Sequence, residues 1–120
     1  MITVELRDMR MHAFHGIYEE EHLKGSPYQI HLKVSYPEDP QADFNHLEQT
    51  IDYAQLFSIV QERMLVPTPL LEKVALSIIR RVKHQFPVAS EISISIYKLA
   101  PPIPHLEGNV GVTFQRSFHA

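Results

Sequence analysis

The sequence contains no cysteine and no tryptophan, and only 4 of its 120 residues are glycine. Without cysteine the chain has no disulfide, no thiolate nucleophile and no cysteine-ligated zinc. The few glycines form no glycine-rich run, which excludes a phosphate-binding loop and a nucleotide-cofactor motif. Any chemistry must therefore come from His, Lys, Tyr, Asp or Glu side chains, or from a bound cofactor.

A surplus of positive charge is also missing. The 11 Lys and Arg residues are outnumbered by 14 Asp and Glu residues, which gives a net charge of -3. Such a chain is a poor match for a phosphate backbone, so we expect no nucleic-acid partner. No segment approaches the roughly 20 apolar residues that span a bilayer, and residues 1–5 lack the basic start and apolar run of a signal peptide. We therefore expect no membrane association and a cytoplasmic location.

Hydrophobic residues make up 44% of the chain, enough for the core of a single domain over residues 1–120. Period-two alternation predicts strands over residues 2–14, with a bulge near Asp8, and over residues 28–36, 92–97 and 110–114. A polar loop joins the first two strands, and another covers residues 37–50. Apolar residues at helical spacing predict one helix from Tyr53, capped by Asp52, and a second helix that ends near Phe86, with Thr68 as its cap and Pro69 at its first position.

This order of elements predicts an α+β fold in which two helices pack on one face of a four-stranded antiparallel sheet. The other face carries mostly uncharged polar side chains: Thr3, Glu5, Gln29, His31, Lys33, Ser93, Ser95 and Tyr97. This set is too polar for a core and too poor in charge for a fully exposed surface. We therefore expect several copies to join edge to edge in a ring, which pairs the open strand edges and lines a central channel with the polar faces.

Four short segments carry a more specific signal. They are HGIYEEEHLKG (15–25), TIDY (50–53), LLE (70–72), and YKLAPPIP (97–104) followed by NVGV (109–112). In this order and at these separations the segments resemble the dihydroneopterin aldolase family of folate biosynthesis, and the match runs nearly end to end. The sequence departs from the family at Ala13, where Gly is frequent, and at Leu99, where several relatives have Pro.

The resemblance implies the tunnelling fold, in which protomers close into a ring and two rings can stack. The homo-oligomer is then a tetramer or an octamer with active sites between neighbouring protomers. The substrate is a small pterin, 7,8-dihydroneopterin, which the family cleaves to 6-hydroxymethyl-7,8-dihydropterin and glycolaldehyde. An accompanying epimerisation at the 2′ carbon is consistent with the same chemistry, because glycolaldehyde can rebind by its other face.

The reaction needs an electron sink when the side-chain carbon–carbon bond breaks. Most aldolases use a lysine Schiff base or a metal ion, but the N5=C6 imine of the dihydropterin already accepts the electron pair. A proton shuttle is then sufficient, and we expect no cofactor. Lys98 is the candidate shuttle because it follows Ile94 and Ile96 in strand parity and so places an ammonium where the pattern calls for an apolar side chain. The alternative is that parity slips and the lysine extends into solvent.

The resemblance assigns roles to further residues, each with an ordinary alternative. Glu72 accepts the parallel N–H donors of the pterin ring, helped by the main chain of Leu71; the alternative is an acid that favours the start of a helix dipole. Tyr53 reaches the site from the neighbouring protomer and relays protons, or it is a core aromatic. Glu21 lies by the catalytic lysine and the substrate hydroxyls, or it is a solvated loop charge.

Two other functions compete with the aldolase. A dihydroneopterin triphosphate 2′-epimerase would need cations for the phosphates, and the loop over residues 101–104 is not basic. A non-catalytic tunnel-forming assembly protein would have no reason to retain the candidate site residues. The 8 histidines do not predict a metal site, because no His-x-His pair exists and His12 and His15 would point to opposite faces of one strand.

Overall fold

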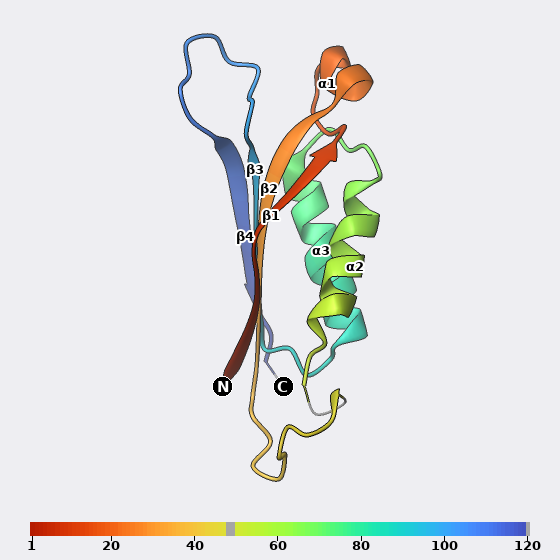
Figure 1. Ribbon diagram of the computed structural model, residues 1–120, viewed down its shortest axis with the longest axis vertical. Coiled ribbons are helices and arrows are strands. Elements are labelled where there is room, and N and C mark those ends of the chain that lie inside the picture. Colours follow the sequence, from red (N-terminus) through yellow and green to blue (C-terminus); the bar gives the residue numbers. More distant parts are fainter. Residues whose placement is uncertain (48–49, 120) are drawn as a thin grey trace.

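Four antiparallel strands form one sheet in the order β1-β2-β3-β4 (Figure 1). The computed structural model describes residues 1–47 and 50–119, so Glu48 and Gln49 of the expected loop lie outside the described residues. The strands are β1 (Ile2–Ala13), β2 (Ser26–Tyr36), β3 (Glu91–Lys98) and β4 (Val110–Ser117). The pairing of β1 with β2 shifts register between Leu6 and Met9, and Asp8 has a φ of 55°, which confirms the predicted bulge.

Two helices cover one face of this sheet, as the alternation predicted. They are α2 (Tyr53–Met64) and α3 (Leu71–Gln85), and Figure 1 shows them side by side against the strands. The core lies between the two layers, and its buried side chains from the sheet and from α3 include Tyr28, Ile30, Leu32, Val34, Ile92, Ile94, Ile96, Val74, Ile78, Ile79 and Val82. The predicted α+β architecture is therefore confirmed.

The opposite face of the sheet is polar, and none of the described helices covers it (Figure 1). Its hydroxyl groups bond across neighbouring strands, with 2.8 Å between Thr3 and Ser35 and 2.8 Å between Ser95 and Thr113. These bonds tie the strands together on the side that carries no hydrophobic layer.

Two local predictions were wrong. A third, short helix, α1 (Glu19–Lys24), forms within the segment that was expected to be a loop. The helix α3 begins at Leu71 with Leu70 as its N-cap, and Thr68 does not cap it. Thr68 is unavailable because its hydroxyl donates to the carbonyl of Val66 and its own carbonyl accepts the N–H of Gly16, just beyond the end of β1.

The elements leave two distinct ends of a molecule that is 54 Å long. In Figure 1 the connection between β3 and β4, the helix α1 and the start of α3 gather at one end. The start of α2 and both labelled ends of the chain lie toward the other end, and Asp52 lines a cleft there with Tyr36 of β2 and Gln85 of α3. This division decides which predicted site residues can meet within one protomer.

Candidate active site

A cleft of about 300 Å³ opens at the end of the molecule where α1 lies. Its walls come from the start of α3, the β3–β4 connection, the first residues of β4 and the turn that follows β1. The lining residues that matter below are Tyr18, Leu71, Glu72, Lys98 and Pro102. The structure therefore brings three of the predicted site residues, Leu71, Glu72 and Lys98, to one cleft.

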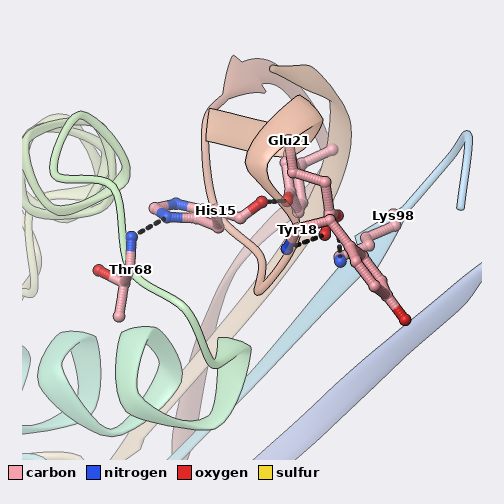
Figure 2. Close-up of polar contacts among 6 residues, drawn as sticks. His15, Tyr18, Glu21, Thr68 and Lys98 are labelled. Carbon is pink, nitrogen blue, oxygen red and sulfur yellow. Dashed lines mark hydrogen bonds and ion pairs between the residues drawn. The ribbon is translucent and has the colours of Figure 1, made fainter. Parts of the chain in front are cut away.

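Lys98 ends β3 and forms an ion pair with Glu21 of α1 (Figure 2). The Lys98 ammonium donates to Oε2 of Glu21 at 2.5 Å, and the two side chains are only 15% and 8% exposed. Oε1 of the same carboxylate accepts the backbone N–H of Tyr18 at 3.3 Å. Neither side chain extends into solvent, so the ordinary alternatives for both residues fail.

The Glu21 carboxylate occupies this position because Gly16 has no side chain. A Cβ at Gly16 would lie within 2.6 Å of three atoms of the Glu21 carboxyl group. Gly16 also has a φ of +127°, a backbone conformation that glycine adopts and other residues rarely do. Glu21 lines a second cleft of about 500 Å³ on the side of α1, and this cleft shares Tyr18 and Pro102 with the first.

Glu72 lies on the first turn of α3 and its side chain is exposed, next to the buried Leu71. The carboxylate lines the cleft, so it is accessible to a ligand that enters there. An acid in the first turn also favours the helix dipole, and the two roles are compatible.

Tyr53 does not meet the other predicted residues within one protomer. It is 66% exposed and is the first residue of α2, a helix that starts toward the opposite end of the molecule. Its exposure excludes the alternative of a core aromatic within the protomer. The adjoining Thr50 and Asp52 line a separate cleft of about 640 Å³ at that end.

His15 is a buried residue to which the sequence assigned no role, although it begins the HGIYEEEHLKG segment and was weighed as a metal ligand. It lies beyond the end of β1, so the expectation that His12 and His15 share a strand was wrong. Its Nδ1 accepts the backbone N–H of Thr68 at 3.1 Å, and its carbonyl accepts the Tyr28 hydroxyl at 3.0 Å. Burial, reinforced by the positive charges of Arg63, Lys98 and His22, lowers the pKa of His15 to about 4.

The neighbouring Tyr28 shows the same effect of burial. Burial raises the pKa of its hydroxyl. A hydrogen bond with Ser26 lowers this pKa in part, and the negative charge of Glu21 raises it further. Within the described residues, no group of three or more His, Cys, Asp or Glu side chains is arranged to hold a metal ion.

Comparison with known proteins places the chain in a family. The profile of the family described as dihydroneopterin aldolase matches residues 4–115. The chain belongs to the dihydroneopterin aldolase family. It is 26% identical to the dihydroneopterin aldolase of Bacillus subtilis, over 97% of this chain and 98% of the relative. It is 28% identical to the enzyme of Streptococcus pyogenes, with the same coverage of both chains.

A solved structure shares the fold over the whole chain. The dihydroneopterin aldolase of Escherichia coli in complex with neopterin superposes with a TM-score of 0.84 at 19% identity, over 98% of this chain and 100% of the other. Membership of the aldolase family confirms the predicted fold and the predicted enzyme activity, dihydroneopterin aldolase of folate biosynthesis. The described helices are all too short or too polar to cross a membrane.

Proposed function

We propose that the cleft holds the pterin ring of 7,8-dihydroneopterin against Glu72 and the main chain of Leu71, with the substrate side chain toward Lys98. The observation that carries this proposal is that Glu72 lines the same cleft as Lys98, which Glu21 holds in a well-shielded ion pair. A carboxylate accepts the ring N–H and 2-amino donors of a pterin as a parallel pair. The neopterin complex of the Escherichia coli enzyme is consistent with a pterin ligand.

The reaction follows as a retro-aldol cleavage with balanced proton transfers. A base removes the proton of the 2′-hydroxyl, the C1′–C2′ bond breaks, and glycolaldehyde leaves. The electron pair of the broken bond moves through C1′ and C6 to N5, which is protonated, so that an enamine replaces the imine. Protonation of C1′ and loss of the N5 proton then give 6-hydroxymethyl-7,8-dihydropterin. No oxidant, metal ion or covalent intermediate is required.

Lys98 is the shuttle for these proton transfers in our proposal. Lys98 lines the cleft, and its ammonium is held there by the Glu21 carboxylate, so it can give a proton to the substrate and take one back in the later step. Tyr53 is proposed to complete the site from a neighbouring protomer, because its exposure and its place toward the other end of the molecule exclude a role in its own cleft. The tetrameric or octameric ring and the cytoplasmic location stay predictions.

A pterin product assay tests the proposed function. The protein is incubated with 7,8-dihydroneopterin or with its triphosphate, and the pterins are separated. We expect cleavage of dihydroneopterin to the hydroxymethyl product, with the 2′-epimer as a minor product. Epimerisation of the triphosphate without cleavage would instead support the epimerase, and no conversion of either compound would support a non-catalytic assembly protein.

The mechanism is tested with Lys98→Ala in the same assay. Removal of a general acid–base group lowers turnover by about 100-fold or more, while neopterin should still bind. Borohydride added during turnover should leave the mass of the wild-type protein unchanged, and chelators should leave its rate unchanged. A reduced adduct on Lys98 would contradict the shuttle, and loss of activity with chelator would contradict metal-free catalysis.

A further inference from the structure

The turn after β1 and the segment before α3 are joined by two hydrogen bonds, although they are about 53 positions apart. The Thr68 N–H donates to Nδ1 of His15 at 3.1 Å, and the Gly16 N–H donates to the carbonyl of Thr68 at 3.0 Å. The chain enters the cleft immediately after each of these contacts, at Ile17 on one side and at Pro69 on the other. The pair of bonds therefore links two walls of the active-site cleft.

Tyr28 of β2 also contacts His15. The Tyr28 hydroxyl donates to the His15 carbonyl at 3.0 Å, and the two rings meet edge to face with their centroids 5.5 Å apart. Tyr28 pairs directly with Lys98 in the register of β2 and β3. Figure 2 shows His15 with Thr68 on one side of it and the Lys98–Glu21 pair on the other. The His15 ring thus contacts the segment that leads into α3 and the strand β2 that pairs with Lys98.

The atom of this imidazole that holds Thr68 is Nδ1. Because Nδ1 accepts a hydrogen bond, the ring hydrogen lies on Nε2, which is buried and has no partner within the described residues. A buried donor without a partner lowers stability, and a phenylalanine of similar shape would avoid that cost. The low pKa of His15, about 4, keeps the ring neutral near pH 7 and leaves Nδ1 able to accept.

We propose that His15 is a positioning residue for pterin binding: by holding Thr68, it fixes the start of α3 and so the place of Leu71 and Glu72 in the cleft. This inference rests on the proposed role of Glu72 as the pterin anchor. Only Pro69 and Leu70 separate the held residue from the helix, so a loss of the contact moves the first turn of α3 directly.

A double-mutant cycle on neopterin affinity tests the proposal. The proteins are the wild type, His15→Phe, Glu72→Gln and the double variant, each used as the assembled protein at one concentration. We expect His15→Phe to weaken binding roughly tenfold in the wild-type background and less than about twofold when Glu72→Gln is present, because residues that act through one another are not additive. Equal losses in both backgrounds, or no loss in either, would overturn the role of His15.

The same cycle separates this inference from the function on which it rests. If Glu72→Gln alone leaves neopterin affinity unchanged, the anchor role itself fails, and the positioning role fails with it. If Glu72→Gln weakens binding but His15→Phe acts independently, only the positioning role fails.

Matched variants distinguish positioning from a general loss of structure. His15→Asn keeps an acceptor close to the place of Nδ1 and should restore affinity to within about threefold of the wild type. Thr68→Ala keeps both backbone bonds and removes only a hydroxyl that donates to the carbonyl of Val66 at 2.9 Å. If His15→Phe does not fold, His15→Asn is compared with His15→Gln, whose longer side chain carries its oxygen past Nδ1. Equal affinity of the Asn and Gln variants, or failure of all variants to fold, would overturn the proposal.

Discussion

The Lys98–Glu21 contact is a buried ion pair, and its energetics differ from those of a surface salt bridge. Both charges have lost most of their water, and each compensates the other. Removing one partner leaves an uncompensated charge in a poorly solvated place, so a single substitution at this site changes stability as well as chemistry. Activity data on Lys98 variants therefore need a stability control.

We expect Lys98→Met to lower the free energy of unfolding by about 3 kcal/mol, because it leaves the Glu21 carboxylate buried and unpaired. The double variant Lys98→Met/Glu21→Gln removes the charge from both positions and should recover most of this loss. Both variants should lack measurable turnover of dihydroneopterin. Urea unfolding at one fixed protein concentration and the pterin assay measure the two quantities. A double variant as unstable as the single one, or an active one, contradicts this account.

The depressed pKa of His15 predicts a dependence of stability on pH. The ring titrates near pH 6.5 in the unfolded chain and near pH 4 in the folded one, so the unfolded state binds more protons between these values. Stability from this group is present above pH 6.5 and is lost as the pH falls toward 4. Between pH 7 and pH 5 the loss amounts to about 2 kcal/mol.

Unfolding measurements on the wild type and on His15→Asn, which has no ring to titrate, isolate this contribution. The free energy of unfolding of the wild type should fall more steeply with acid than that of the variant. Parallel curves over this range would show that the His15 ring does not stay neutral in the folded protein.

At the scale of elements, α1 depends on tertiary contacts for its existence. A helix of 6 residues is too short to be stable alone, and three consecutive glutamates give it no apolar face. Its third residue, Glu21, attaches it to Lys98 of β3 and lies against Gly16 of the preceding turn. The position of α1 is therefore set by the site that it helps to form.

Gly16→Ala should displace the Glu21 carboxylate and lower turnover at least tenfold. The introduced methyl group overlaps the carboxylate, and the positive φ adds backbone strain of about 1–3 kcal/mol. Gly108→Ala is the matched control, since Gly108 has a φ of +144° but no atom within 4 Å of an added Cβ. This control should lose similar stability yet keep turnover within about threefold of the wild type. Equal activity losses in the two variants would show that backbone strain alone is responsible.

The same contacts explain which elements could be predicted from the sequence. The four strands and the apolar stripe of α3 repeat over many residues, so their periodicity identifies them without knowledge of the fold. The helix α1 and the start of α3 were predicted wrongly because a distant residue decides each of them: Lys98 for α1, and His15 for the segment around Thr68. A motif of His followed by Gly gave a signal at this place, but a sequence does not show which backbone group an imidazole contacts.

Among the candidate site residues, Glu21 could be predicted only from the family resemblance. Composition alone favours a solvated charge for Glu21, and only the spacing from Gly16 to Gly25 distinguishes it from Glu19 and Glu20. The residues His15, Gly16 and Tyr18 lie in the same segment, but the pattern assigns them no role. Their role depends on how the turn after β1 packs against β2 and α3, which is a property of the tertiary structure.

At the scale of the whole molecule, one protomer leaves three features without a partner. No described helix covers the polar face of the sheet, and the outer edges of β1 and β4 do not pair with another of the described strands. The exposed Tyr53 begins α2, which starts toward the opposite end from the cleft. Edge-to-edge closure of several copies would satisfy all three at once. We therefore expect sedimentation to give a ring oligomer, and a species with the 13.9 kDa mass of one chain at micromolar concentration would contradict the ring.

Shared active sites predict that two inactive variants restore activity when they assemble together. Lys98→Ala lacks the shuttle and Tyr53→Phe lacks the hydroxyl that the neighbour supplies, so each should be nearly inactive alone. When the two variants are co-expressed, their chains mix at random in the rings. A site is intact when its lysine comes from a Tyr53→Phe chain and its tyrosine comes from a neighbouring Lys98→Ala chain. About a quarter of all sites meet this condition. Co-expression of Lys98→Ala with Glu21→Gln is the control, since both residues belong to one cleft of one chain and mixing cannot restore it. Recovery in the first mixture and not in the second would locate Tyr53 at its neighbour's site, whereas failure of both mixtures to recover would exclude a site shared between protomers.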